Sequence, residues 1–191
     1  MAMDQFINQV AKSRYMFGGQ ASLPVVFRSA MFYGLSTAAH HSDRPYPMFM
    51  NVPGLKIMVP ASPTDAKGLL RTAIDMDDPV LSFEACLLWG MKEDIEDGEF
   101  RIPFGVARTV RQGTDVTIVA ISSAVPQAVL AAQILETEGI SAEIIDPRTL
   151  VPLDSLAILN SVARTGRLVI ADPANRTCGA AAEISAIVSE L

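Results

Sequence analysis

One strand–helix–strand unit in the first half constrains the fold of this chain more than any other stretch. Residues 55–59 and 80–83 are short, mostly apolar runs of the kind that form buried parallel strands. Between them, Ser62, Pro63 and Asp65 make a strong helix start, with Ser as the N-cap and Pro at the first helical position. The connecting turns are short, which indicates a right-handed parallel crossover. The sequence therefore predicts an α/β fold that contains a parallel sheet.

The alternation of strand and helix patterns continues on both sides of this unit. Asp4 is a candidate cap for a first helix that Gly18 and Gly19 would end, and residues 24–27 look like another buried strand. In the second half, residues 105–110 and 116–121 resemble two strands joined by a turn at residues 112–113. Helix and strand patterns then alternate over residues 126–138, 142–145, 154–164, 168–171 and 179–191. This order predicts a second, small open parallel sheet, which one more strand could extend after the last helix.

The segment between the two halves has a different character. Residues 86–104 include an acidic run at 93–99 that lacks both helical and strand periodicity. We interpret the segment as a linker. Charge runs are usually solvated, so we interpret the acidic run as a solvated loop rather than a binding site.

Composition excludes several functional classes. Apolar residues make up 50% of the 191 residues and charged residues 19%, so a core is easily buried. The net charge is −6 with no run of Lys or Arg, which argues against nucleic acid or an anionic membrane as partner. No apolar run reaches the ~18 residues that a membrane span needs. Cys86 and Cys178 lack metal-ligand spacing, so we expect reduced, buried or half-buried thiols and a cytoplasmic location.

Both histidines of the chain, His40 and His41, lie within residues 28–44, directly after a predicted strand. Histidine titrates near neutral pH, and the loop beyond the carboxyl end of a parallel strand is a common place for chemistry. The alternative is a surface histidine without a chemical role, and spacing alone favours that alternative. Neither half contains a Gly-x-Gly-x-x-Gly stretch, a P-loop, a Cys-x-x-Cys pair or a nucleophile elbow.

Several stretches, taken in order, resemble one family. They are MDQFINQVAKSRYMFGGQ, then Arg28 followed thirteen residues later by His41 and Ser42, then VPGLKIMVPASPTDAKGLLRTAI, DDPVLSFE, DPRTLVPLD and RTCGAAAEI. Together they are similar to the beta subunit of thiamine-diphosphate-dependent 2-oxo acid dehydrogenases, the transketolase-like group that handles pyruvate, branched-chain 2-oxo acids or acetoin. The similarity extends over nearly the whole chain.

The resemblance implies a domain organisation and a set of partners. Residues 1–85 would be the latter part of a pyrimidine-binding domain with a parallel sheet. Residues 105–191 would be a transketolase-type C-terminal α/β domain, incomplete at its end. The family assembles an alpha subunit with a second beta chain, shares thiamine diphosphate and magnesium between subunits, and passes an acyl group to a lipoyl acyltransferase. An isolated chain of this kind is expected to be inactive.

The resemblance also assigns a role to His41, which matches the histidine of the family's His-Ser pair near the reacting centre. That histidine is implicated in proton transfer and in handing the acyl group to the lipoyl arm, which suits a side chain that titrates near the working pH. His40 stands where the family usually has Gln or Glu, and we expect it to be a bystander.

A second site implied by the resemblance would hold a monovalent cation such as potassium. Its ligands would be a main-chain carbonyl near Val25 and the turn in which Ala73, Ile74, Met76 and Asp78 match the family's loop. Carbonyl oxygens suit such a cation. Met76 replaces a residue that is commonly Asp, and an ordinary helix-ending turn with solvated aspartates is an equal alternative.

Two departures from the family pattern bear on function. Residues 29–33 are Ser-Ala-Met-Phe-Tyr where the family has glycines, so we expect this loop to run differently. The glutamate that activates the cofactor's aminopyrimidine precedes the first helix in the family, and no carboxylate of this chain matches it, so no cofactor-binding residue is assigned. Two alternatives stay open: a non-catalytic homologue acting as a structural or interaction module, and a relative of transketolase or deoxyxylulose-phosphate synthase.

Overall fold

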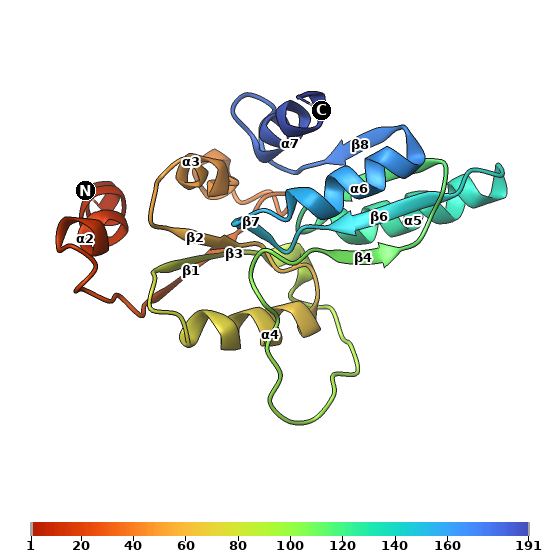
Figure 1. Cartoon of the computed structure of the whole chain (residues 1–191). Helices are drawn as coiled ribbons and strands as arrows, with labels where there is room; N and C mark the ends of the chain where they lie inside the picture. The colour runs from red at the N-terminus through yellow and green to blue at the C-terminus, as the bar shows by residue number, and fades with distance from the viewer. Residues whose placement is uncertain (1, 191) are drawn as a thin grey trace.

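Eight strands form two four-stranded sheets in the computed structural model, which describes residues 2–190. The first sheet has the order β1-β3-β2-β7 and the second β4-β6-β5-β8, and the two lie side by side (Figure 1). The strands are β1 Val26–Met31, β2 Lys56–Met58, β3 Val80–Ala85, β4 Arg108–Arg111, β5 Val116–Ala120, β6 Ala142–Asp146, β7 Thr149–Val151 and β8 Leu168–Ala171. The predicted α/β class is confirmed.

The predicted strand–helix–strand unit is present at the centre of the first sheet. β2, α4 (Pro63–Ile74) and β3 follow one another, and β2 pairs in parallel with β3. Ser62 Oγ accepts the backbone N–H of Asp65 at 3.1 Å, which is the predicted N-cap. β3 also pairs in parallel with β1. The carboxyl ends of all three strands therefore meet at one edge of the sheet.

The N-terminal helix is a continuous run whose segments are α1 (Ala2–Asp4), the π-helical η1 (Gln5–Val10) and α2 (Ala11–Met16). Asp4 does not cap it, contrary to the prediction, because its backbone is already helical and its carboxylate accepts the Asn8 amide at 2.7 Å. Gly18 and Gly19 both have positive φ and end the helix as predicted.

The turn before β2 sets how closely this helix approaches the sheet. Gly54 has φ +96°, and a Cβ added there would lie 1.9 Å from the carbonyl oxygen of Ala11. A side chain at this position would push the helix backbone away. From the same helix, Phe6, Ile7 and Val10 pack against the main core.

In the second sheet, β5, β6 and β8 are parallel and alternate with helices α5 (Ala124–Thr137), α6 (Ser155–Thr165) and α7 (Ala180–Ser189). The predicted hairpin of β4 and β5 is wrong, because β4 pairs antiparallel with β6 and the sheet is mixed. A Cβ added at Gly113 would lie 2.2 Å from backbone atoms of Ala142 and Glu143. The glycine therefore lets the chain pass close beside β6 instead of folding β4 back on β5.

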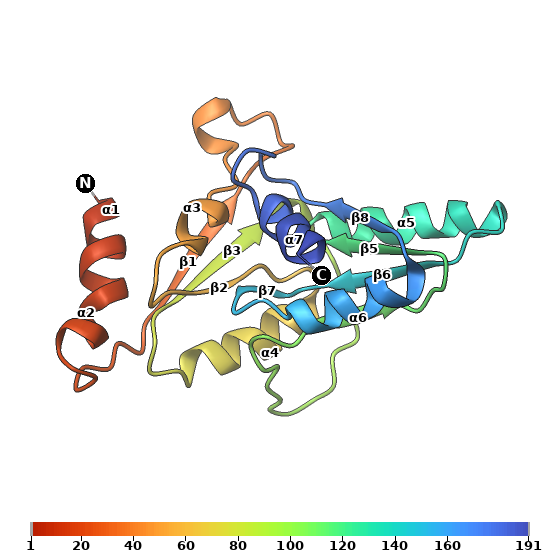
Figure 2. The same cartoon turned by 45° about the horizontal axis from the view of Figure 1, so that its top comes forward.

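No strand is predicted at residues 149–151, yet this segment forms β7 and joins the first sheet. β7 pairs antiparallel with β2, with Val151 opposite Ile57 and Thr149 opposite Met58. The second half of the chain thus supplies the edge strand of the first sheet, as the turned view shows (Figure 2).

Helices cover both faces of both sheets. The main core cluster draws residues from α2, α3 (Tyr46–Met50), α6, α7 and both sheets, while separate clusters lie under α4 and under α5. Along β5, Val119 faces the main cluster, and Ile118 and Ala120 face α5, the alternation expected of a strand buried on two sides. Within residues 2–190, no helix combines the length and the apolar character needed to cross a bilayer.

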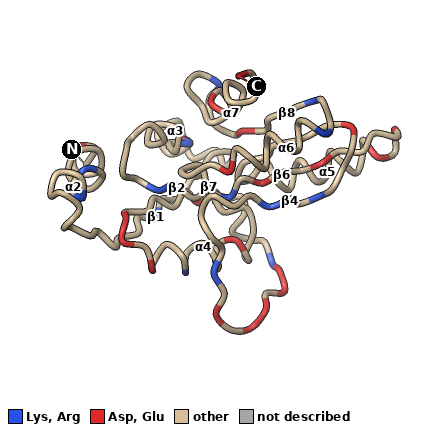
Figure 3. Tube along the Cα trace, viewed as in Figure 1, with Lys and Arg blue, Asp and Glu red and all other residues tan. Residues whose placement is uncertain are grey.

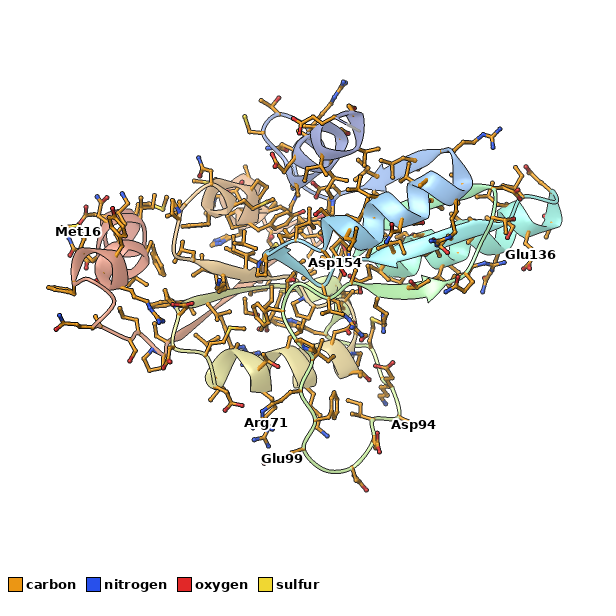
Figure 4. The ribbon with its side chains drawn as sticks, in the orientation of Figure 1. Met16, Arg71, Asp94, Glu99, Glu136 and Asp154 are labelled. Atoms are coloured by element: carbon orange, nitrogen blue, oxygen red, sulfur yellow. The ribbon has the colours of Figure 1, made fainter. Side chains whose placement is uncertain are left out.

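The acidic run is an exposed loop without helix or strand, as predicted, and two of its carboxylates bond to α4. It forms the red stretch below α4 in Figure 3. Glu93 accepts the backbone N–H of Thr64 at 3.0 Å in the first turn of the helix, where the helix dipole favours a negative charge. Glu99 forms an ion pair with Arg71 at 3.2 Å, and the two side chains point toward each other in Figure 4. Ile102, further along, is buried in the cluster under α4.

Both cysteines are free thiols. Cys86 is half-buried, as expected, and burial raises the pKa of its thiol. Cys178 is exposed in the loop before α7, so the prediction of a buried or half-buried thiol is wrong for this residue.

Candidate active site

The carboxyl ends of β1 and β3 bring two chain segments together at one edge of the first sheet. Residues 32–45 follow β1 and contain the 3-10 turn η2 (Ala39–His41), and the turn η3 (Cys86–Leu88) follows β3. Phe32 and Trp89, one from each segment, meet edge to face with ring centroids 5.9 Å apart. Open parallel sheets bind their ligands at this edge, so we take it as the candidate active site.

Arg28 on β1 and Glu84 on β3 form a two-point ion pair just before this edge. The guanidinium donates from Nε and Nη2 to the two carboxylate oxygens, each at 2.7 Å, and Ser82 donates to the same carboxylate at 2.9 Å. In register Arg28 lies opposite Ser82, so Glu84, two residues on, shares its face of the sheet. Burial raises the pKa of Glu84, but the bonds from Arg28 and Ser82 outweigh it and hold that pKa below its usual value.

A cleft of about 400 Å³ opens beside this ion pair. Its lining combines the two charged groups with apolar side chains, including Leu88, Trp89 and Met91, and Ser62 at the start of α4. Trp89 is 60% exposed and offers a flat surface on which a ring could stack. Neither histidine is among the residues that line this cleft.

The turn η2 presents both histidines to solvent. The rings of His40 and His41 lie 4.2 Å apart between centroids. The carbonyl of Ala38 accepts the hydroxyl of Ser42 at 2.8 Å and the backbone N–H of His41 at 3.3 Å, which closes the turn. The structure therefore places His41 on an ordered turn beyond β1, where a bound molecule can reach its ring.

Residues 29–31 continue β1, and only Phe32 and Tyr33 of this stretch lie beyond the strand. The strand runs to Met31, beyond the predicted end at residue 27, and Met31 is 1% exposed. Tyr33 then shares a hydrogen bond with Ser123 in the second half, and burial raises the pKa of the phenol. Large side chains suit this stretch because they fill the core and bridge the two halves.

Residues 32–46, from the end of β1 to the start of α3, form the histidine segment. Two further contacts tie the end of this segment to the second half, and the sequence did not reveal them. Arg44 Nε donates to the carbonyl of Pro173 at 2.6 Å, and the Tyr46 hydroxyl donates to the carboxylate of Asp172. Burial raises the pKa of Tyr46, and its bond to Asp172 adds to the effect. The partners lie 129 and 126 residues apart, so no local pattern could identify them.

The predicted cation ligands lie together at the opposite edge of the same sheet. The carbonyl of Val25 accepts the N–H of Val80, and the carbonyl of Ala73 accepts the N–H of Met76, at 2.9 and 3.3 Å. The side chain of Met76 packs against the core cluster under α4, and Ile74 is exposed. Across residues 2–190, no group of three or more His, Cys, Asp or Glu side chains is arranged to hold a metal.

The carboxylate in that set already has a partner. Asp78 accepts Arg14 Nη1 of the N-terminal helix at 3.0 Å. The carbonyls of Val25 and Ala73 each keep a second lone pair, and the Asp78 carboxylate keeps its other oxygen, so these atoms are the acceptors left for a cation at this turn.

A buried charge cluster joins the two halves beside the start of α4. Asp65 accepts Arg148 Nε at 2.7 Å and lies 3.5 Å from Arg108, which lies 3.7 Å from Asp146. Asp146 accepts the backbone N–H of Arg148 on one oxygen, while its Oδ2 makes no hydrogen bond among the described residues. Burial raises the pKa of Asp146 to about 7, the charge of Asp65 adds to the effect, and Arg108 opposes it.

Asp146→Asn should flatten the pH dependence of stability. The Asp146 carboxyl has a pKa of about 7 in the folded state and 3.8 in the unfolded chain, so the folded state holds its proton more tightly. The stability that comes from this proton is complete below pH 3.8 and is lost as pH rises through 7. Between pH 3.8 and 7, each pH unit should lower the free energy of unfolding of the unaltered protein by about 1.4 kcal/mol. Urea unfolding at a series of pH values between 4 and 8 measures this slope. Parallel curves for the two proteins would contradict the assignment.

Comparison with known families identifies the two halves. Residues 2–85 match the family described as transketolase, pyrimidine binding domain, and residues 105–191 match transketolase, C-terminal domain. This chain belongs to the transketolase family. The predicted place of the chain in the transketolase-like group is therefore confirmed.

Within the transketolase family, the chain is similar to beta subunits of oxidoreductases. It is 47% identical over 190 residues to the beta subunit of acetoin:2,6-dichlorophenolindophenol oxidoreductase from Cupriavidus necator, covering 100% of this chain and 56% of that one. It is 43% identical over 187 residues to the pyruvate dehydrogenase E1 component subunit beta from Rickettsia bellii, covering 98% and 58%. The chain thus spans 56% and 58% of the length of these two relatives.

Solved transketolase structures share the fold. A split-gene transketolase, described as an inactive beta4 tetramer, matches with a TM-score of 0.81 and 23% identity over 99% of this chain and 58% of that one. A transketolase from Pichia stipitis matches with a TM-score of 0.59 and 16% identity over 94% and 31%.

Proposed function

We propose that this chain is the beta-subunit portion of a 2-oxo acid dehydrogenase. With an alpha subunit, it would take part in the oxidative decarboxylation of a 2-oxo acid and in acyl transfer to a lipoyl group. One observation carries the proposal. Almost the whole chain, 100% and 98% of its length, aligns with the beta subunits of an acetoin oxidoreductase and of a pyruvate dehydrogenase. Residues 1–85, 86–104 and 105–191 are then the latter part of the pyrimidine-binding domain, the connecting segment and the C-terminal domain.

His41 is the residue proposed to move a proton during acyl transfer. Its support is the turn beyond the carboxyl end of β1, which holds the backbone in place and leaves the ring exposed. A general acid or base must come within hydrogen-bond reach of the reacting group, and an exposed ring can do so when a partner closes over it. His40 shares the exposure but not the proposed role.

The cofactor implied by the family is thiamine diphosphate with magnesium, and the described residues fit it only in part. Trp89 offers a stacking wall at the cleft. Activation of an aminopyrimidine ring needs a carboxylate that is free to bond a ring nitrogen, whereas Glu84 has both oxygens bonded to Arg28 and one also to Ser82. Glu84 therefore does not fit that role. We assign the cofactor to the assembled enzyme, with its diphosphate and magnesium on the alpha subunit.

The proposed partners follow from the same similarity: an alpha subunit, a second beta chain and a lipoyl acyltransferase. Potassium at the turn of Ala73 and Met76 is a further proposal, supported by the closeness of that turn to the start of β1. We also propose a cytoplasmic location, since both cysteines are free thiols.

Calorimetric titration of thiamine diphosphate with magnesium tests the function. The cofactor is titrated into this chain alone, into an alpha subunit of the acetoin or pyruvate dehydrogenase type alone, and into the mixture. We expect little binding to the chain alone and binding in the mixture at least tenfold tighter than to the alpha subunit alone. A mixture that behaves like the alpha subunit alone would overturn the proposal and favour a non-catalytic structural module.

A further inference from the structure

The backbone that leads into the histidine turn is held in an unfavourable conformation. Ser36 has φ 55° and Ala38 has φ 67°, and neither is a glycine. Residues other than glycine adopt this left-handed region at a cost, and they keep it only where surrounding contacts enforce it. The bonds within the turn, from Ser42 and His41 to Ala38, close it locally but do not fix its position relative to the sheets.

Arg44 links the turn to both halves of the molecule. Its Nη1 donates to the carbonyl of Ser42 at 2.7 Å, next to His41, and its Nε donates to the carbonyl of Pro173 at 2.6 Å in the loop after β8. Its guanidinium carbon lies 5.1 Å from the centroid of the Tyr33 ring, which precedes the turn. A planar fork with several donors can make all three contacts at once, which a lysine cannot.

Tyr46 and Asp172 make the second link. Tyr46 is completely buried, and its hydroxyl donates to the Asp172 carboxylate. The same carboxylate accepts the backbone N–H of Ala174 at 2.9 Å and that of Ala181 at 3.0 Å, at the start of α7. The carboxylate therefore holds three donors, one of which belongs to the histidine segment.

We propose that Arg44 and Tyr46 are positioning residues for His41, acting through Pro173 and Asp172 of the C-terminal half. The catalytic consequence rests on the function proposed above for His41. One end of the histidine segment continues from β1, and these two links fix the other end against β8 and α7. The C-terminal half then sets where the ring of a residue in the pyrimidine-binding half lies.

Histidine ring resonances provide a direct test, since the chain has two histidines and one His40→Gln variant assigns them. NMR spectra of the full chain with isotope-labelled histidine are compared for Arg44→Ala, Arg44→Lys and Tyr46→Phe. Tyr15→Phe is the matched control, because Tyr15 is 88% exposed. We expect shifted and broadened His41 ring signals in Arg44→Ala and Tyr46→Phe, a smaller change in Arg44→Lys, and none in the control.

Activity of the assembled enzyme supplies the second readout. A displacement of the ring by about 1 Å should lower the rate of lipoyl acylation at saturating 2-oxo acid by about 10- to 100-fold and leave KM nearly unchanged. Unchanged His41 signals in both variants would overturn the positioning proposal. A second outcome would also overturn it, provided that His41→Ala itself slows acylation. In that outcome the His41 ring signals of Arg44→Ala and Tyr46→Phe change, but both variants acylate the lipoyl group at the normal rate. A fully active His41→Ala enzyme would instead overturn the proposed role of His41, and the ring signals would still decide the structural coupling.

Discussion

His41→Ala should slow acyl transfer to the lipoyl group by about 10²- to 10⁴-fold in the enzyme assembled from beta chain, alpha subunit and lipoyl domain, the range that one general acid or base contributes. Alanine retains the backbone N–H that donates to Ala38, so the turn should persist. Single-turnover acylation, followed by mass spectrometry of the lipoyl domain, measures the rate.

His40→Ala is the matched control for this prediction. It lies on the same turn, its ring centroid is 4.2 Å from that of His41, and it is also exposed. We expect its rate to stay close to that of the unaltered enzyme. Equal losses in the two variants would point to the turn as a whole, and full activity in both would exclude His41 from the chemistry.

Gly54→Ala should lower the free energy of unfolding by about 2–5 kcal/mol. A positive φ costs a residue with a Cβ about 1–2 kcal/mol, and overpacking adds about 1–3 kcal/mol. Here the added Cβ would lie 1.9 Å from the carbonyl oxygen of Ala11, a backbone atom that moves only with its helix. Urea unfolding followed by circular dichroism gives the value.

Gly139→Ala separates the two causes. Gly139 has φ +79°, but a Cβ there would meet no atom within 4 Å. Its cost should therefore be the conformational part alone, about 1–2 kcal/mol. If Gly54→Ala and Gly139→Ala lowered the free energy of unfolding equally, the close approach between the Gly54 turn and α2 would contribute nothing to stability.

The elements of the fold could be predicted where local chemistry decides them. Ser62 and Pro63 define the start of α4, and the apolar runs at β2, β3 and β8 lie where the sequence places them. Strand pairing was harder, because it depends on residues far apart. The residues before β5 look like a hairpin, yet β6 takes the place beside β4, and the short β7 has no periodicity that distinguishes it from a loop.

The candidate site divides in the same way. The position of His41 beyond β1 could be predicted from its own neighbourhood, and its chemical role came from a family resemblance. The pairing of Arg28 with Glu84 depends on the register of two strands, and that of Tyr46 with Asp172 depends on how the two halves dock. Neither register nor docking can be read from local sequence, so these contacts became visible only in three dimensions.

The placement of β7 has a consequence for synthesis on the ribosome. β2 acquires its outer neighbour only when residues 149–151 have left the exit tunnel, long after β1, β2, α4 and β3 have emerged. Until then the nascent first sheet exposes the edge of β2, a template for unwanted pairing with other chains. A gene split between the two sheets would leave the amino-terminal product with this edge uncovered. The two family domains are therefore separate in sequence but share the first sheet.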